Sequence, residues 1–413
     1  MDEHPNILLI LSDQQRADTI CALGDSFGVS TPALDGLVHR GVSFTHAFCA
    51  APVSCPARAS IVTGLYPTQA GVPDNTSPPL NDGLFTIGAL MQAAGYETAY
   101  FGKSHLKGNL AHYGFETAYE NSHDPTTVSE AARFWRNRDW IREKRPFFHI
   151  VSLLDPHDIY FLDPDAEDEP VLPPWPNAED TLAGKPACQK PKRVGWSEKR
   201  WQYYRRFYRE RVERLDRHIG QLLDELLWSG FAPNTWVIFT SDHGDMAGEH
   251  GIPFKGPFMY EGVVRIPLVI CPPAVRFGGK DKRSVEIARQ LKPFRSDILV
   301  SQVDLVPTLL EIAGAPAPEA LPGKSIFPVI AGRPFTEREA VFAEWSAPAI
   351  RMVRTKRWKY TVDETGAEEL YDLEEDPAEM ENLAPVSRCR QTKEHLRGML
   401  RSHLASVSDP FRL

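Results

Sequence analysis

The sequence has no long hydrophobic run, no paired cysteine motif and no excess of basic residues. Its first apolar run covers only residues 7–11, and no basic segment precedes it. Such a run is too short for a membrane span or a secretory signal, so we expect a cytoplasmic protein without a membrane partner. The six cysteines have no CxxC spacing. This argues against a zinc site and favours reduced thiols over a disulfide framework.

The charge balance also limits the partners that we expect. The formal net charge is −9, whereas a nucleic-acid-binding protein is usually basic, so we expect no nucleic-acid partner. With 413 residues, of which 42% are hydrophobic and 24% charged, the chain can bury a sizeable core. Its length suits one large domain and a smaller one.

Short apolar runs alternate with helical patterns over most of the chain. This rhythm predicts an α/β fold with a large, mostly parallel sheet flanked by helices. The runs that we expect to be buried strands are residues 6–11, 98–101, 147–153, 236–240 and 268–271. Apolar and aromatic residues recur at three- and four-residue steps over residues 197–229, before Gly230. That pattern predicts a long amphipathic helix whose aromatic residues pack in the core.

The α/β rhythm ends near residue 336, which we take as a domain boundary. Residues 1–336 are predicted to form the catalytic domain, with a surface insertion at about 163–196 that is rich in proline and charge. Residues 337–413 are predicted to form a small α+β subdomain. Its antiparallel strands are expected at 340–345, 351–362 and 369–373, and its helix at 387–404.

Polar residues able to do chemistry follow four of the predicted strands. In open α/β sheets, ligands bind outside the carboxyl ends of the strands. A single Asp or His in such a place is usually a helix cap, a turn residue or a packed side chain. Four such segments at one sheet edge indicate a functional site. They are Ser12-Asp13-Gln14, Gly102-Lys103-Ser104-His105, Asp155-Pro156-His157 and Ser241-Asp242-His243-Gly244.

Part of this set suits a divalent cation. Asp13, Gln14 and Asp242 offer hard oxygen atoms, and His243 offers one imidazole. Such donors favour Ca²⁺, with Mg²⁺ or Mn²⁺ possible. Zinc is disfavoured because no thiolate is offered.

One further segment, residues 52–64, suggests an anion site. A helix start near Pro56 would place Ser54 at a helix N-terminus, where free N–H groups favour an anion. Arg58 would lie one turn further on. Taken alone, without the polar strand ends, the segment favours an ordinary capping serine and a surface arginine.

These residues resemble the sulfatase family. Ser54-Cys55-Pro56-Ala57-Arg58 followed by Thr63-Gly64 is similar to the family signature, C/S-x-P-x-R with a later T-G. Nearly the whole chain outside 163–196 resembles the family. The other matching segments are residues 5–14, 102–106, 241–244, 248–251, 255–256, 303–314, 369–373 and 376–377.

The resemblance implies an alkaline-phosphatase-like fold and a formylglycine nucleophile. Pro56 sets the register, so the modified residue is Ser54 and not Cys55, which implies a radical maturase as a partner. A plain serine attacking sulfur would leave a stable ester on the enzyme. A hydrated aldehyde has a second hydroxyl that can expel sulfate.

The resemblance also implies a role for each site residue. Asp13, Gln14, Asp242 and His243, together with the modified Ser54, would hold the metal. Three cations, Arg58, Lys103 and Lys255, would stabilise the nucleophile and the sulfate charge. His105 would assist collapse of the intermediate, and His157 would bind sulfate or protonate the leaving oxygen.

Two alternatives stay open. Many sulfatases have two adjacent acids where this chain has Asp13-Gln14, a pair that resembles phosphonate monoester and phosphodiester hydrolases of the same superfamily. The non-enzyme alternative is an oxyanion-binding protein with unmodified Ser54. We expect a small-molecule or saccharide sulfate ester as substrate, and tryptophan and arginine in the 163–196 insertion favour a sugar. Aryl and choline sulfates remain possible, and the oligomeric state is not predicted.

Overall fold

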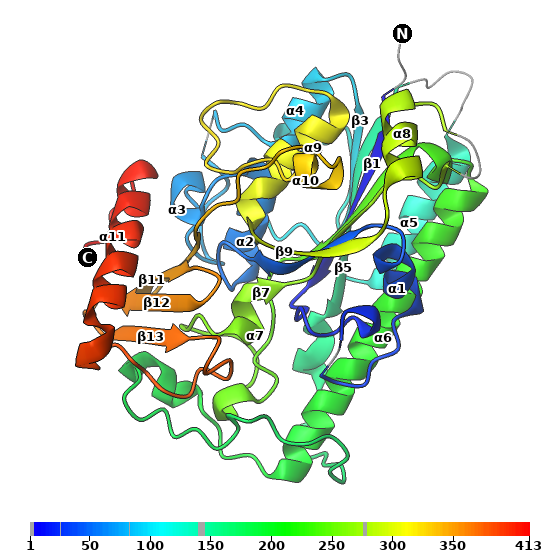
Figure 1. Ribbon diagram of the computed structural model, residues 1–413. Coiled ribbons are helices and arrows are strands. Elements are labelled where there is room, and N and C mark those ends of the chain that lie inside the picture. The colour runs from blue at the N-terminus through cyan, green and yellow to red at the C-terminus, as the bar shows by residue number, and fades with distance from the viewer. Residues whose placement is uncertain (1–3, 25, 82, 139–144, 276–278) are drawn as a thin grey trace.

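A computed structural model of the chain describes residues 4–24, 26–81, 83–138, 145–275 and 279–413 (Figure 1). Within these residues a nine-stranded sheet has the order β4-β3-β5-β1-β6-β8-β2-β7, with β9 also paired to β2. Its strands are β1 (Asn6–Asp13), β2 (Val42–Phe48), β3 (Glu97–Gly102), β4 (Thr117–Tyr119), β5 (Phe147–Pro156), β6 (Thr235–Ser241), β7 (Arg265–Ile266), β8 (Leu268–Cys271) and β9 (Phe294–Ser301).

The sheet is mixed, and its parallel half contains the four strands that precede the polar segments. β4, β3, β5, β1 and β6 are mutually parallel, whereas β8 runs antiparallel to both β6 and β2. All five strands expected from the sequence are present, with ends that differ by three residues or fewer. The predicted α/β fold class is therefore confirmed.

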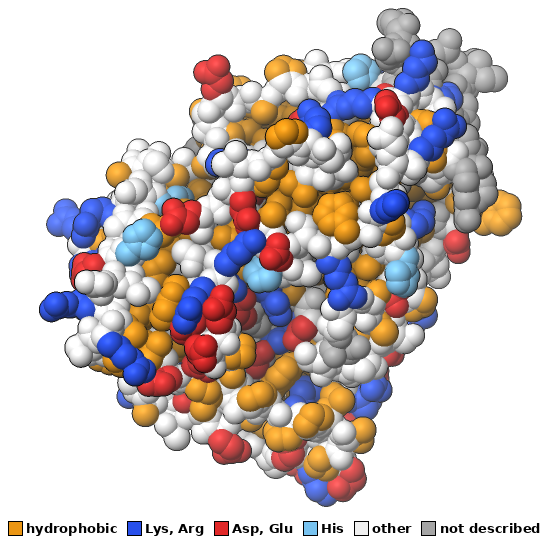
Figure 2. Space-filling model, in the orientation of Figure 1, with side chains coloured by type: hydrophobic (Ala, Val, Ile, Leu, Met, Phe, Trp, Pro, Cys, Tyr) orange, Lys and Arg blue, Asp and Glu red, His pale blue; other side chains and the backbone are white. Residues whose placement is uncertain are grey.

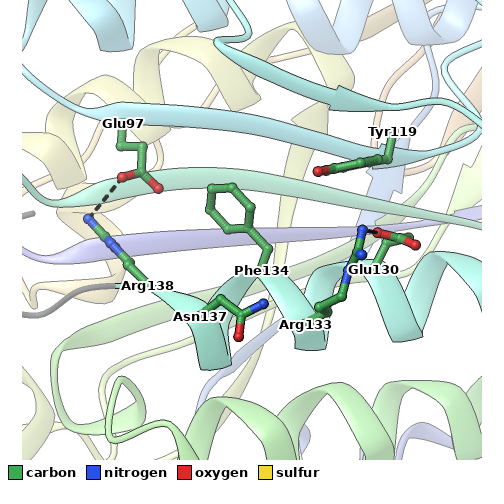
Figure 3. Close-up of a pocket in the computed structure, with 7 residues that line it drawn as sticks. All are labelled: Glu97, Tyr119, Glu130, Arg133, Phe134, Asn137 and Arg138. Carbon is green, nitrogen blue, oxygen red and sulfur yellow. Dashed lines mark hydrogen bonds and ion pairs between the residues drawn. The ribbon is translucent and has the colours of Figure 1, made fainter.

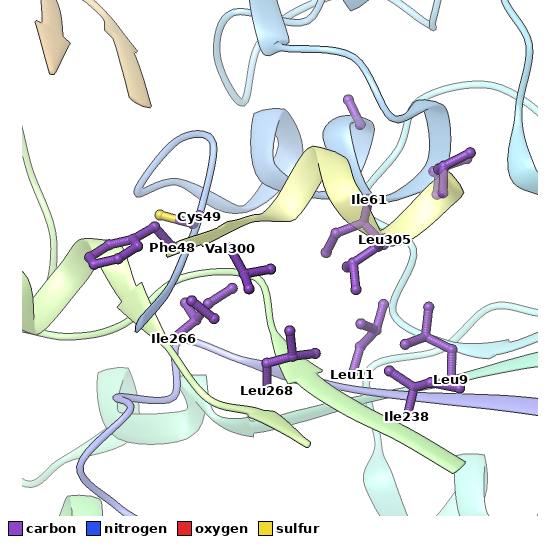
Figure 4. Packing of buried hydrophobic residues seen from close by; sticks show 14 of the residues in the cluster. Leu9, Leu11, Phe48, Cys49, Ile61, Ile238, Ile266, Leu268, Val300 and Leu305 are labelled. Atoms are coloured by element: carbon purple, nitrogen blue, oxygen red, sulfur yellow. The ribbon is translucent and has the colours of Figure 1, made fainter. Parts of the chain in front are cut away.

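Helices cover both faces of this sheet because β1 is apolar on both sides. Its alternate residues Ile7, Leu9 and Leu11 pack with α2, α4 and α9, and the residues between them, Leu8 and Ile10, pack with α1, α5 and α6. Figure 4 shows the first of these layers, with Leu9 and Leu11 close to Leu305 of α9. The helices are α1 (Pro32–Val38), α2 (Ser54–Thr63), α3 (Pro67–Ala70), α4 (Ile87–Ala93), α5 (Asp124–Asn137), α6 (Glu198–Trp228), α7 (Glu261–Val264), α8 (Lys282–Gln290), α9 (Leu305–Ala313), α10 (Phe327–Ile330) and α11 (Arg390–Ser406).

The long helix predicted over 197–229 is α6, which runs across the molecule (Figure 1). It begins after Ser197, whose side chain accepts a hydrogen bond from the Arg200 N–H and so satisfies one free donor of the first turn. Trp201, Tyr204 and Tyr208 are buried, as expected.

A second sheet of four antiparallel strands, in the order β10-β11-β12-β13, lies near the C-terminus. One face packs under α11 through Val353, Leu370 and Leu400. The other face joins the main core through Met352 and Tyr371. The strands are β10 (Val341–Ser346), β11 (Ala349–Arg354), β12 (Trp358–Asp363) and β13 (Glu368–Asp372).

The 163–196 segment, predicted to be a surface insertion, is partly buried. Leu182, Lys185 and Gln189 are buried. The Gln189 amide donates to Glu369 of β13 at 2.9 Å, and the Lys185 ammonium donates to the Glu379 carbonyl oxygen at 2.6 Å. The segment differs from the expectation because its polar groups bind the C-terminal part of the chain, a contact that local sequence pattern does not reveal.

The structure also bears on two expectations from composition, which concern the cysteines and membrane-spanning helices. All six cysteines lie in the described residues and are free thiols. Across the same residues, no helix is both long and apolar enough to span a bilayer. The face in Figure 2 has acidic and basic side chains interspersed, a distribution that favours solubility.

Candidate active site

The polar segments converge because β3, β5, β1 and β6 are parallel neighbours. Asp13 is the last residue of β1, Lys103 follows β3, and His157 follows β5. Asp242 and His243 follow β6. Ligand atoms of Asp13, Asp242 and His243 all lie within 4.8 Å of one another. Side chains from four strand ends therefore meet at one edge of the sheet.

Ser54 is the first residue of α2, and Val53 occupies the N-cap position. Its side chain is fully buried. Its Oγ lies 3.1 Å from His243 Nε2 and 3.5 Å from the Lys255 ammonium. The structure therefore does not support the alternative of an ordinary capping serine.

Arg58 lies in the same helix and has an exposed fraction of 1%, so it is not a surface cation. Its guanidinium donates to Asp242 Oδ2 at 2.9 Å and to Asp13 Oδ2 at 3.0 Å. It also donates to Ser152 Oγ at 2.8 Å and to the Lys103 carbonyl oxygen at 2.6 Å. Arg58 thus holds the two carboxylates in place.

One carboxylate oxygen in this cluster has no hydrogen-bond partner among the described residues. Asp242 Oδ1 accepts from the backbone N–H groups of Gln14 and His243, at 2.9 and 2.8 Å. Nothing among the described residues donates a hydrogen bond to the buried Asp13 Oδ1. A buried carboxylate oxygen without a partner is costly. A divalent cation would satisfy it, and the surrounding oxygen and imidazole donors fit Ca²⁺, Mg²⁺ or Mn²⁺.

Hydrogen bonds fix how Gln14 and His243 present their donor atoms. The Gln14 amide N–H donates to Asp245 Oδ2 at 2.6 Å, so its Oε1 faces the site, where the Lys255 ammonium donates to it at 2.7 Å. His243 Nδ1 lies 2.8 Å from the Gly244 carbonyl oxygen. Because a carbonyl can only accept, Nδ1 carries the proton and Nε2 keeps its lone pair toward Ser54.

Sequence reasoning missed the residues that support this loop. Asp245 accepts from the Tyr204 hydroxyl at 2.9 Å, and the Tyr208 hydroxyl donates to the Gln14 carbonyl oxygen at 2.7 Å. Both tyrosines were expected only to pack in the core. The one available signal was Asp245 itself, a further carboxylate three residues after Asp242.

Positive charge governs the ionisation of the cluster. Burial alone would raise the pKa of Asp13, but Lys103, at 2.5 Å, and Arg58 hold that pKa well below its ordinary value. Burial, together with the charge of Lys103, lowers the pKa of Lys255 to about 8. The site therefore has an ionised Asp13 carboxylate and, below about pH 8, a charged Lys255 ammonium.

His105 and His157, the two histidines predicted to transfer protons or bind sulfate, are neutral in this environment. Burial and the nearby cations Lys103 and Arg58 lower the pKa of His105 to about 4. Burial, with Lys103 and Lys255 nearby, lowers the pKa of His157 to about 3. A bound anion near either ring would favour its protonated form.

The loop that bears His157 is held from α6. Arg214 pairs with Asp158 at 2.5 Å and donates to Asp155 Oδ1 at 2.7 Å, so it contacts residues on both sides of His157. Neither contact could be predicted from sequence, because Arg214 is 56 residues from Asp158.

A pocket of about 460 Å³ elsewhere lies between the β3–β4 edge and α5 (Figure 3). Glu97, which lines it, is the first residue of β3 and pairs with Arg138 at 3.4 Å. The pocket extends along β3 from Glu97 to Tyr119, which pairs with Phe101, and none of the residues that line it belongs to the strand-end site.

Comparison with known proteins shows the family of the chain. The sequence model of the family described as Sulfatase matches residues 5–315, and that described as N-sulphoglucosamine sulphohydrolase, C-terminal, matches residues 248–406. A Delta 4,5-hexuronate-2-O-sulfatase of Bacteroides thetaiotaomicron is 27% identical, over 99% of this chain and 91% of that protein.

Two solved structures are similar over almost their whole length. A 2-O GAG sulfatase has a TM-score of 0.84 and 25% identity, over 99% of this chain and 94% of the other. The phosphonate monoester hydrolase of Agrobacterium radiobacter has a TM-score of 0.81 and 25% identity, over 98% and 96%. With the family match over most of its length, the chain belongs to the sulfatase family and is a sulfuric ester hydrolase.

Proposed function

We propose that the enzyme hydrolyses sulfate esters with a formylglycine formed from Ser54 and a divalent cation bound beside it. The observation that carries this proposal is the unpartnered Asp13 Oδ1 in a cluster with Asp242 and His243, whose Nε2 lies 3.1 Å from the buried Ser54 hydroxyl. The Lys255 ammonium lies 3.5 Å from the same hydroxyl. A formylglycine hydrate would supply one hydroxyl for attack on sulfur and a second for release of sulfate. A radical maturase would make the modification.

The chain's own residues would prepare the site for this chemistry. Asp13, Gln14, Asp242 and His243 would hold the cation, Ca²⁺ by preference, and Arg58 would keep the carboxylates aligned. Lys103 and Lys255 would contact the sulfate and stabilise its charge in the transition state.

The two histidines would handle protons. His105 and His157 are neutral before the substrate binds, and the sulfate anion would raise their proton affinity. His105 would take a proton as the nucleophile is regenerated. His157 would bind sulfate or give a proton to the leaving oxygen.

The substrate class that we propose is a sulfated saccharide. A hexuronate-2-O-sulfatase and an ulvan-active sulfatase each match 99% of this chain, which supports a sugar. An arylsulfatase and a choline-sulfatase match 96% and 93% of it, so aryl and choline sulfates are the competing esters. Phosphonate monoester hydrolysis is the second candidate, because Asp13-Gln14 departs from a pair of acids and a phosphonate monoester hydrolase has nearly the same fold.

A rate comparison separates the two candidates. Matured enzyme is assayed on 4-nitrophenyl sulfate and on 4-nitrophenyl phenylphosphonate, which share a leaving group, with Ser54→Ala as the control for contaminating activity. We expect a higher kcat/KM for the sulfate. A higher value for the phosphonate would reassign the enzyme. Loss of neither activity in the Ser54→Ala protein would leave Ser54 without a catalytic role.

Metal binding has its own test. Calorimetric titration of chelator-treated enzyme with Ca²⁺ should show one site, and Asp13→Asn should weaken its affinity by about tenfold to a hundredfold, as loss of metal-site groups does. Glu364→Gln, which changes an exposed carboxylate, is the matched control and should bind Ca²⁺ normally. Equal affinity in Asp13→Asn would exclude Asp13 as a ligand.

A further inference from the structure

A cavity of about 600 Å³ lies outside the strand-end site, between helix α3 and the second sheet. Its walls come from three parts of the chain. These are α3 with the segment after it, the second sheet with the turns that follow β10 and β12, and the C-terminal tail. Residues that line it include Thr68, Asp74, Trp345, Glu364, Phe411 and Arg412. Its volume is typical of a small-ligand site.

One wall of this cavity is continuous with the start of α2. Asp74 lines the cavity, and the next residue, Asn75, accepts a hydrogen bond from the Cys55 N–H at 3.0 Å. Cys55 directly follows Ser54. On the other side of the same turn, the Lys107 ammonium donates to the Thr76 carbonyl oxygen at 2.8 Å. The turn at residues 74–76 therefore lies between the cavity and the residues around Ser54, because Asp74 lines the cavity and Asn75 binds Cys55.

The cavity is preformed. The indole N–H of Trp345 donates to the Ala347 carbonyl oxygen at 3.0 Å, which fixes a partly exposed ring. Arg351 pairs with Asp409 through two bonds of 2.6 and 2.9 Å, which anchors the tail carrying Phe411 and Arg412. A rigid aromatic face gives a binding surface at little cost in conformational entropy.

The polar groups around that ring suit hydroxyl donors. Asp74 Oδ1 already accepts from Thr76, and Glu364 Oε2 accepts from the Ala349 N–H at 3.1 Å, so the second oxygen of each carboxylate is the one offered to a ligand. Arg412 is the exposed cation. Glu344, also in the wall, already accepts from the Thr68 N–H at 3.0 Å and from its hydroxyl at 2.6 Å. With acids in excess, a second sulfate or carboxylate would be repelled, whereas uncharged hydroxyls would donate to the acids.

From this arrangement we propose that the cavity is a subsite for a neutral sugar joined to the sulfated one, with its ring stacked on Trp345. The inference rests on the proposed sulfatase function and narrows its substrate to an oligosaccharide. It makes Trp345 a specificity-determining residue that acts through binding, not chemistry.

The test uses matured enzyme and a panel of singly sulfated N-acetylglucosamine, galactose and hexuronic acid. Each is compared with the disaccharide that adds one glucose, and 4-nitrophenyl sulfate reports turnover without any sugar. We expect at least one disaccharide to gain about tenfold in kcat/KM over its monosaccharide, mainly through KM, which corresponds to roughly 1.4 kcal/mol of binding. If no disaccharide gains, the subsite is excluded.

Variants test whether the gain in kcat/KM of the disaccharide depends on residues of the cavity. Trp345→Ala should remove most of it while changing kcat/KM for 4-nitrophenyl sulfate less than twofold, and Glu364→Ala, at an exposed position, should reduce it about threefold. Trp228→Ala, an 84% exposed tryptophan at the end of α6, is the matched control. A gain that survives both Trp345→Ala and Glu364→Ala contradicts the proposal. Absent turnover of 4-nitrophenyl sulfate and of every sugar would instead overturn the sulfatase function.

Discussion

Two buried clusters of charged side chains differ in how completely their atoms are paired. At the strand ends, Asp13 and Asp242 face Arg58, Lys103 and Lys255, and Asp13 Oδ1 still has no partner among the described residues. The second group, here called the interface cluster, consists of Glu261, Arg354, Lys359 and Glu379, and it joins α7 to the C-terminal sheet.

The interface cluster is closed. The Lys359 ammonium donates to the Met259 carbonyl oxygen and to Glu379 Oε1, both at 2.8 Å, and pairs with Glu261 at 2.8 Å. Within the described residues, none of its buried side-chain atoms lacks a hydrogen-bond partner. A closed cluster holds two parts of a fold together, whereas the unpaired carboxylate oxygen of the strand-end cluster lies among donors that suit a cation. Substitutions should therefore affect activity at one cluster and stability at the other.

The largest expected effect is at Ser54. Ser54→Ala should abolish turnover, because the side chain that would become the nucleophile is missing. It should leave the Tm almost unchanged, because only one small hydroxyl is lost. Steady-state kinetics and thermal unfolding measure the two. Retained turnover, or loss of folding, would end the contrast between the clusters.

The next effect concerns the two lysines of the strand-end cluster. Lys103→Ala and Lys255→Ala should each lower kcat about a hundredfold or more, since a cation facing transition-state charge is worth roughly 3–4 kcal/mol. The Tm should barely change in Lys255→Ala, because Lys255 donates to the uncharged Gln14 and Ser54. Lys103→Ala should lower the Tm less than Lys359→Met does, because buried Asp13 keeps Arg58 as a partner. Lys199→Ala, at a half-exposed surface lysine, is the control and should match wild type. A change of only a few-fold would mean that the lysine does not contact the reacting sulfate.

The interface cluster should respond in the opposite way. Lys359→Met should lower the free energy of unfolding by about 3 kcal/mol, because it leaves Glu261 and Glu379 buried with too little positive charge. Urea denaturation measures this loss, and kcat per folded molecule should stay at the wild-type value. Lys356→Met, at an exposed lysine near the second sheet, is the control and should change stability by less than about 0.5 kcal/mol. Equal losses of unfolding free energy in Lys359→Met and Lys356→Met would show that burial of the ion pairs does not increase their contribution to stability.

The smallest effect is a pH dependence. The pKa of Lys255 is lowered to about 8, so its positive charge is present below that pH and is lost as the pH rises through it. We expect kcat/KM to fall about tenfold per pH unit above roughly pH 8, as for one required protonated group. Lys255→Arg keeps its charge and should lose this alkaline limb. An unchanged limb in Lys255→Arg would assign the titration to another group.

The contrast also shows what sequence can predict. The strands that feed the site were found because they are continuous apolar runs, buried on both faces, that stop at polar residues such as Asp13 and Asp242. β2 and β9 were missed. Ser43, Thr45 and His46 interrupt β2, and β9 begins with exposed and polar residues, so neither has the pattern of a buried strand.

Contacts between segments that are distant in the sequence could not be predicted from it. Gln189 and Glu369 are 180 residues apart, and Arg214 reaches Asp155 across 59 residues. Local periodicity contains no information on such pairs. The same holds for the hydrogen bond from Tyr204 to Asp245, which depends on how α6 crosses the sheet.

The central claim is that the strand-end cluster surrounds a formylglycine made from Ser54. The most direct measurement is the mass of the Ser54-containing peptide from enzyme that turns over sulfate esters. The account predicts a peptide lighter than the serine form by two hydrogen atoms, in a fraction that rises in proportion to specific activity when a radical maturase is co-expressed. Full activity in enzyme whose peptide has only unmodified serine would contradict it.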